Sequence, residues 1–157
     1  MSKKWKNFVN EGKEYDNISS RVICVGENDK ILLIKRSEKS ITGAGKWDIP
    51  GGHVDERDRS LERAAQRELF EETNIFCPEE DLIYIDRDDW KKDKVYYYAF
   101  PYNRDKITIH PNPDTGFVEH SEYKWATIDQ IKEYEKQELP TFPIYLLRKA
   151  LEKVQNL

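Results

Sequence analysis

Short apolar runs separated by turn residues recur along the chain and predict a series of strands. The run at residues 30–36 is apolar throughout its middle, which is typical of a strand buried on both faces. Segments with helical spacing separate several of these runs, so we expect a mixed sheet. Strands are predicted over residues 21–25, 30–36, 46–49, 82–85, 95–102, 106–109 and 122–125.

Three segments with helical spacing predict helices. The first begins near Ser60, a good cap residue, and a short one over 128–134 follows the cap residue Thr127. The last begins near Pro143 and carries apolar residues on one face. The core side of the first helix is given by positions three or four residues apart: Leu61, Ala64, Ala65 and Leu69.

Strands and helices alternate over 157 residues, which predicts an α/β fold with a mixed sheet covered by helices on both faces. A chain of this length and pattern is expected to form one domain over residues 1–157. Residues 1–17 precede the predicted strands and could form an N-terminal arm.

Composition narrows the range of partners. The net charge is −4 and no helix carries a basic stripe, so nucleic acid is not an expected partner. No apolar run approaches the length of a membrane helix, about 20 residues. The cationic start is not followed by an apolar run, so we do not expect a signal peptide there. Cys24 and Cys77 fit neither a disulfide framework nor zinc spacing, so we expect buried thiols in a cytoplasmic protein. The sequence does not fix the oligomeric state, and a homodimer remains one option.

The segment Arg67–Glu72 concentrates negative charge on one side of the first predicted helix. Its acids Glu68, Glu71 and Glu72 stand at offsets 0, 3 and 4, which places their Cβ atoms on one helix face about 5–6 Å apart. Like charges at this spacing repel by about 0.2–0.5 kcal/mol per pair, so a cation is expected there. Hard ions such as Mg²⁺ choose carboxylate oxygens and are usually shared with substrate phosphates. The pattern therefore predicts a divalent metal site.

These acids lie within residues 51–75, GGHVDERDRSLERAAQRELFEETNI. This segment resembles the signature of the Nudix hydrolases, G-x5-E-x7-R-E-U-x-E-E-x-G-U, where U is an aliphatic residue. Residues 67–72 and Ile75 match the signature in register. Asn74 stands where the signature has Gly, at a helix C-cap where Asn tolerates the left-handed conformation.

The first half of the segment departs from that signature. Arg67 comes one residue later than the pattern predicts, which indicates a one-residue insertion in the loop 55–59. The first Glu of the signature is then replaced by Asp58 or lost to Arg59. In the family that Glu mainly supports the loop and its Arg, so the departure concerns loop geometry more than catalysis.

The resemblance implies the Nudix-type α/β/α sandwich and the chemistry of that family. Its members cleave a nucleoside diphosphate linked to another group by attack of water on phosphorus, with Mg²⁺ or Mn²⁺ as cofactor. Arg67 is expected to orient carboxylates and to count among the catalytic residues. The metal ligands implied on the glycine turn and the helix are the carbonyl of Gly51 and the carboxylates of Glu68, Glu71 and Glu72.

A further acid from a loop is often needed in such enzymes. Glu119 is the candidate for a catalytic metal ligand, since an acid six residues before a Trp, here Trp125, is similar to the mutator-type pyrophosphohydrolases. Glu122 is the second candidate. Glu68 and Glu119 both qualify as the general base, and the sequence does not choose between them.

The substrate is expected to be a small nucleotide. Several markers of other subgroups are absent, so the first hypothesis is a nucleoside triphosphate pyrophosphohydrolase that yields a monophosphate and pyrophosphate. The alternatives are an ADP-ribose or nucleotide-sugar pyrophosphatase, a non-catalytic nucleotide sensor, and an RNA-end hydrolase, which the acidic balance disfavours. Arg36 and Lys46 are candidate phosphate contacts, and Tyr96 is a candidate platform for the base.

Overall fold

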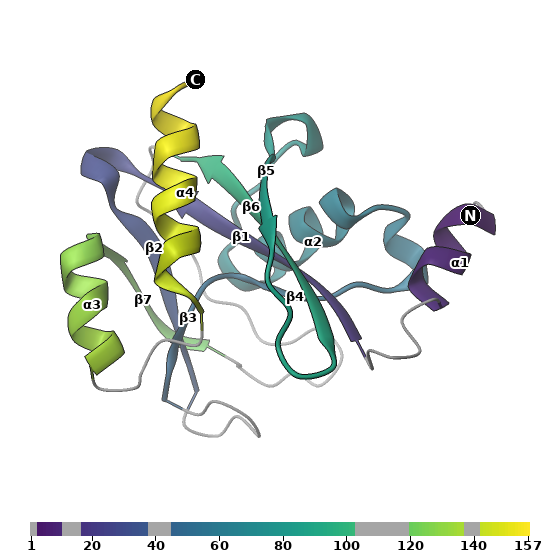
Figure 1. Cartoon of the computed structure of the whole chain (residues 1–157), viewed down its shortest axis with the longest axis horizontal. Helices are drawn as coiled ribbons and strands as arrows, with labels where there is room; N and C mark the ends of the chain where they lie inside the picture. Colours follow the sequence, from purple (N-terminus) through teal and green to yellow (C-terminus); the bar gives the residue numbers. More distant parts are fainter. Residues whose placement is uncertain (1–2, 11–16, 38–44, 103–119, 137–141) are drawn as a thin grey trace.

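A mixed β-sheet runs through the middle of the molecule, with helices on both of its faces (Figure 1). The computed structural model describes residues 3–10, 17–37, 45–102, 120–136 and 142–157. Within these residues the sheet has seven strands, in the order β3-β2-β1-β6-β5, with β4 paired to β1 and β7 paired to β2. The strands are β1 (Asn17–Val25), β2 (Ile31–Arg36), β3 (Trp47–Asp48), β4 (Gly51–His53), β5 (Ile83–Arg87), β6 (Asp93–Pro101) and β7 (His120–Ala126).

The central pair of strands makes the sheet mixed. β1 and β6 run parallel, in register from Asn17 opposite Asp93 to Val25 opposite Pro101. The other pairings are antiparallel. A parallel pair at the centre is buried on both faces, which agrees with the apolar character of β1.

The helices divide between the two faces of the sheet. In Figure 1, α4 crosses in front of the strands and α2 lies behind them. The α-helices are α1 (Lys3–Asn10), α2 (Leu61–Thr73), α3 (Ile128–Lys136) and α4 (Ile144–Gln155). Short 3₁₀ turns are formed by η2 (Glu27–Asp29), η3 (Glu56–Asp58) and η4 (Glu79–Asp81). The predicted α/β/α arrangement is confirmed.

Side-chain alternation along β1 supplies both layers of the core. Ile23 packs with Leu146 and Leu147 of α4 on one face, and Val22 packs with Leu69 of α2 on the other. Each fully buried Leu or Ile stabilises the fold by about 1.5–3 kcal/mol relative to its exposed state. The two layers therefore fix α2 and α4 to opposite faces of the same strand.

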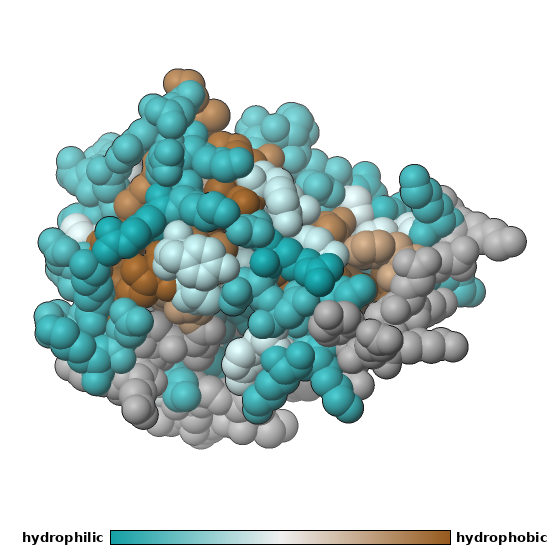
Figure 2. Space-filling view, in the orientation of Figure 1, coloured by the Kyte–Doolittle hydropathy of each residue, from teal (hydrophilic) through white to brown (hydrophobic). Residues whose placement is uncertain are grey.

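The surface above this core is largely polar. Figure 2 shows hydrophilic side chains over most of the viewed face, with apolar groups appearing along α4 and between α3 and α4. None of the helices in the described part of the chain is long and apolar enough to cross a membrane. Cys24 and Cys77 are buried and form no disulfide, as predicted.

The structure extends some predictions and adds elements that were not predicted. β1 begins four residues before the predicted start, at Asn17, because it pairs there with β4 and β6. β4 and α1 were not predicted. In α1, Trp5 packs with Ile18 and Ala64, so part of the predicted N-terminal arm is a docked helix. The strand predicted over 106–109 lies outside the described residues.

Candidate active site

The ends of α2 are set by local capping. Ser60 is in an extended conformation and its Oγ accepts a hydrogen bond from the Arg63 N–H at 3.0 Å. At the other end Asn74 adopts the left-handed conformation, with φ 64°, and its N–H donates to the carbonyl of Phe70. Both caps were predicted. They set where α2 begins and ends, and so which of its residues face the η3 loop that precedes it.

The inserted residue lies at the end of the η3 turn. Arg59 takes the left-handed conformation with φ 67°, which lets the chain turn into α2 with one residue more than the signature has. Asp58 is buried, and its Oδ2 accepts a hydrogen bond from the Asp55 N–H at 2.8 Å. Asp58 therefore occupies the position of the first signature acid, and the alternative with Arg59 there is excluded.

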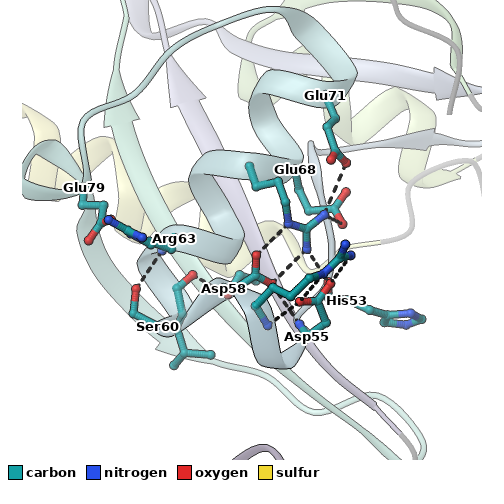
Figure 3. A network of polar contacts seen from close by, with 12 residues as sticks. His53, Asp55, Asp58, Ser60, Arg63, Glu68, Glu71 and Glu79 are labelled. Carbon is teal, nitrogen blue, oxygen red and sulfur yellow. Dashed lines mark hydrogen bonds and ion pairs between the residues drawn. The ribbon is translucent and has the colours of Figure 1, made fainter. Parts of the chain in front are cut away.

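Arg67 contacts several of the residues labelled in Figure 3, among them Asp58, Glu68 and Glu71. Its Nε and Nη2 donate to the two oxygens of Asp58 at 2.7 and 2.9 Å, a bidentate pairing. Its Nη1 donates to Glu68 at 3.0 Å and to Glu71 at 3.3 Å. Nη2 also donates to the carbonyl of His53 at 3.1 Å. One guanidinium thus joins the η3 turn, β4 and two helix acids, the orienting contact expected of Arg67.

The two glycines before the loop bring the backbone against the other acids. The Gly51 N–H donates to Glu72 Oε1 at 3.2 Å. A Cβ on Gly52 would lie 2.6 Å from the carboxylate carbon of Glu68. Gly51 has φ +152°, and a Cβ there would meet the backbone of Ser20 and Arg21. A side chain is excluded at Gly51, and a side chain at Gly52 would displace the Glu68 carboxylate, so the two glycines let the turn approach the helix acids.

The electrostatics of Glu72 suit a cation site. Its burial and the neighbouring Glu68 carboxylate raise the pKa of Glu72 well above its usual range, while the positive charge of Arg21 opposes the rise. A buried carboxylate beside a second carboxylate gains most from a bound cation, which lowers the energy of the charged form of each.

The donor set fits a hard divalent ion such as Mg²⁺ or Mn²⁺, because it consists of carboxylates and backbone carbonyls. Within the described ranges no three carboxylate, imidazole or thiol side chains converge on one point. The guanidinium of Arg67 contacts both Glu68 and Glu71 instead. Ion binding at these acids would therefore compete with Arg67 for Glu68 and Glu71.

A buried ion pair beside Glu72 was not found by sequence reasoning. Arg21 Nη1 donates to Asp48 Oδ1 at 3.0 Å, and Asp48 is almost fully buried. A lone Arg at the start of an apolar strand and an acid just before the glycine turn were the available signals. The two residues are 27 positions apart, so their pairing became visible only in the fold.

The predicted substrate contacts fall into two places. Arg36 ends β2, with its Nη1 3.8 Å from Asp48 Oδ2, and its N–H donates to the carbonyl of the exposed Lys46. Tyr96 of β6 lies on the α2 face, with its ring 6.4 Å from that of Phe8. Alternation along β6 places it there, where it packs against Ile18, Val54 and Ala64.

Glu119 and Glu122 were the two candidate loop acids. Glu119 lies outside the described residues. Glu122 is exposed on β7, directly opposite Lys35 of β2. The choice of general base between Glu68 and Glu119 therefore stays open.

Comparison with known proteins decides the family. Residues 17–147, which include the glycine turn, α2 and β7, match the NUDIX domain model. The chain belongs to the NUDIX family. Among solved structures, this NUDIX chain is similar to a MutT protein from Methanosarcina mazei Go1. The two share 30% identity and a TM-score of 0.58, over 89% of this chain and 93% of that one.

Two curated relatives carry names that describe an activity. A Bacillus subtilis (strain 168) protein, provisionally named 8-oxo-dGTP diphosphatase, is 46% identical over 52 residues, which are 33% of this NUDIX chain and 31% of the relative. An RNA pyrophosphohydrolase of Bartonella henselae is 25% identical over 142 residues, 79% of this chain and 73% of the relative. The first match thus spans less than a third of its relative, and the second spans most of both proteins.

Proposed function

We propose that this chain is a divalent-metal-dependent pyrophosphohydrolase that cleaves a phosphoanhydride bond of a nucleotide. The observation that carries the proposal is the pairing of the glycine turn with the helix acids. Gly51 donates to Glu72, and Gly52 leaves room for the Glu68 carboxylate. Membership of the NUDIX family supports the same reaction.

The roles of the residues follow from their places. Glu68, Glu71, Glu72 and the Gly51 carbonyl would hold Mg²⁺ or Mn²⁺, with Glu119 as a further ligand from its loop. When bound, the ion neutralises the diphosphate oxygens and lowers the pKa of a coordinated water. Arg67 orients Glu68 and Glu71 and connects them to Asp58.

In the proposed reaction, the oxygen of water forms a bond to phosphorus and the phosphoanhydride P–O bond breaks. The displaced phosphate oxygen takes the bonding electrons. The proton of the water passes to the general base, Glu68 or Glu119. Arg36 and Lys46 are proposed to contact the phosphates and Tyr96 the base.

A nucleoside triphosphate is the first substrate proposed, with a monophosphate and pyrophosphate as products. The name of the Bacillus subtilis relative supports this substrate class. The second candidate is the triphosphate end of RNA, because the Bartonella henselae relative, which matches more of the chain, is named for RNA. The net charge of −4 favours the free nucleotide. ADP-ribose, nucleotide sugars and binding without cleavage are the remaining alternatives, and the cytoplasmic location and homodimer stay predictions.

Product analysis tests the proposal. The protein is incubated with Mg²⁺ or Mn²⁺ and separate samples of nucleoside triphosphates, 5′-triphosphate RNA, ADP-ribose and nucleotide sugars, and the products are resolved by ion exchange. Monophosphate and pyrophosphate from a free triphosphate are the expected result. Pyrophosphate released only from RNA would move the assignment to the second candidate. Binding of nucleotides without any cleavage would overturn the enzyme proposal in favour of a sensor.

A further inference from the structure

The Arg21 side chain connects the central strand to the segment that carries the glycine turn. Its Nη1 donates to Asp48 Oδ1 at 3.0 Å and to the Ile49 carbonyl at 3.1 Å. Only 23% of the side chain is exposed. One guanidinium therefore fixes both the side chain of Asp48 and the backbone of the next residue.

The following residues are tied to β1 one after another. Asp48 Oδ1 also accepts the Ile49 N–H at 2.8 Å. The Pro50 carbonyl accepts the Val22 N–H at 2.8 Å. Gly51 then pairs with Arg21 itself in the β1–β4 ladder. These contacts leave the turn little freedom at the residue whose N–H donates to Glu72.

The Arg21–Asp48 ion pair lies near Glu72 but should repel a bound cation only weakly. Arg21 and Asp48 together carry no net charge, so their direct repulsion of a metal ion is small. The positive charge of Arg21 lowers the pKa of Glu72, and the Asp48 carboxylate raises it. A second guanidinium, that of Arg36, lies 3.8 Å from Asp48.

We propose that Arg21 is a positioning residue of the metal site. Through Asp48 and the Ile49 carbonyl it holds the turn so that the Gly51 N–H meets Glu72 and the backbone is placed to share the ion. Arg21 touches neither the ion nor the substrate in this account. The inference rests on the proposed function in one respect only, that Glu72 and Gly51 serve a divalent ion.

The test compares four proteins: the wild type, Arg21→Lys, the double variant Arg21→Met/Asp48→Asn, and Arg63→Met. The double variant removes both charges, so that no buried carboxylate is left without its partner. Arg63→Met is the matched control, because it removes an exposed α2 arginine that pairs with Glu79. Mn²⁺ binding is measured by electron paramagnetic resonance without nucleotide. Urea unfolding reports stability, and amide exchange of Gly51 reports the turn.

The expected result is a loss of Mn²⁺ affinity of about tenfold in the double variant, the size typical for residues that orient metal ligands. Arg21→Lys should lose about threefold, because an ammonium does not reproduce the geometry of a guanidinium. Arg63→Met should stay within about twofold, because exposed ion pairs contribute little. Exchange at Gly51 should accelerate in the first two variants and not in the control.

Wild-type Mn²⁺ affinity and Gly51 exchange in a folded double variant would overturn the proposal. If the double variant does not fold, unchanged affinity in Arg21→Lys would overturn it equally. Failure of the proposed function is a separate result: it is a wild type that binds Mn²⁺ yet cleaves none of the nucleotides. The comparison of affinities then still decides the role of Arg21.

Discussion

The two halves of α2 carry similar residues in different surroundings. The first turn has Glu62 and Arg63, and the second half has Arg67 and Glu72. Arg63 makes one exposed ion pair with Glu79, whereas Arg67 contacts three acids and a backbone carbonyl. The difference comes from what faces each half. The glycine turn and the η3 loop contact the second half. Burial and shared contacts therefore distinguish the candidate site from the first half, although both halves contain Glu and Arg.

The largest effect should come from exchanging one glutamate in each half. Glu72→Gln removes the buried charge at the glycine turn, and turnover should fall at least about a thousandfold, since a bound ion supplies several kcal/mol of transition-state stabilisation. Glu62→Gln changes an acid that accepts a hydrogen bond from the Tyr98 hydroxyl. It should keep turnover within about threefold, because one neutral hydrogen bond remains available. Steady-state kinetics at saturating Mg²⁺ measures the turnover of both variants. Equal losses of turnover would contradict the proposed difference between the two halves of α2.

The two arginines provide the next contrast, in the free energy of unfolding. Arg67→Met leaves the buried Asp58 without its guanidinium and should destabilise the fold by about 3 kcal/mol, as breaking a buried pair does. Arg63→Met should cost about 0–1 kcal/mol. Urea denaturation with both variants gives the values. A cost below 1 kcal/mol for Arg67→Met would mean that the η3 loop does not depend on this network.

A smaller effect is expected at the glycine turn. In Gly52→Ala the new methyl group would meet the Glu68 carboxylate, which is the movable end of a side chain. The fold should survive with a cost of about 1–3 kcal/mol for the added bulk, while Mn²⁺ affinity falls. Calorimetric Mn²⁺ titration, paired with urea unfolding, separates the two quantities. Unchanged affinity would show that Glu68 does not need its observed position.

The smallest effect is expected at the end of the helix. Asn74 has φ 64°, a conformation that glycine adopts with less strain. Asn74→Gly should stabilise the protein by about 0.5–1 kcal/mol, and Asn74→Ala should destabilise it by a similar amount. Urea midpoints distinguish the signs. A destabilised glycine variant would indicate that the Asn side chain contributes more than its backbone conformation.

Local signals in the sequence predicted much of the second half of α2. Ser60 and Asn74 are cap residues by type, and the spacing of Glu68, Glu71 and Glu72 defines a face whatever the rest of the chain does. The sequence could not show whether Asp58 or Arg59 occupies the position of the first signature acid, because that depends on which residue takes a left-handed backbone. That choice is settled by the contacts of Arg67 with the loop.

Elements that exist through long-range pairing were not predicted. β4 is Gly51–His53, which has no apolar alternation, and it is a strand only because it pairs with β1. The Arg21–Asp48 pair likewise depends on β1 and β3 meeting across the sheet. Helix α1 is short, and it is stabilised by the packing of Trp5 rather than by its own propensity.

Direct titration of Mn²⁺ in the absence of nucleotide tests the central claim most directly, with electron paramagnetic resonance of the wild type, Glu72→Gln and Glu62→Gln. The account predicts that the wild type and Glu62→Gln bind with affinities within about threefold, and that Glu72→Gln loses about tenfold or more. Wild-type affinity in Glu72→Gln would contradict the assignment of the metal to the second half of α2.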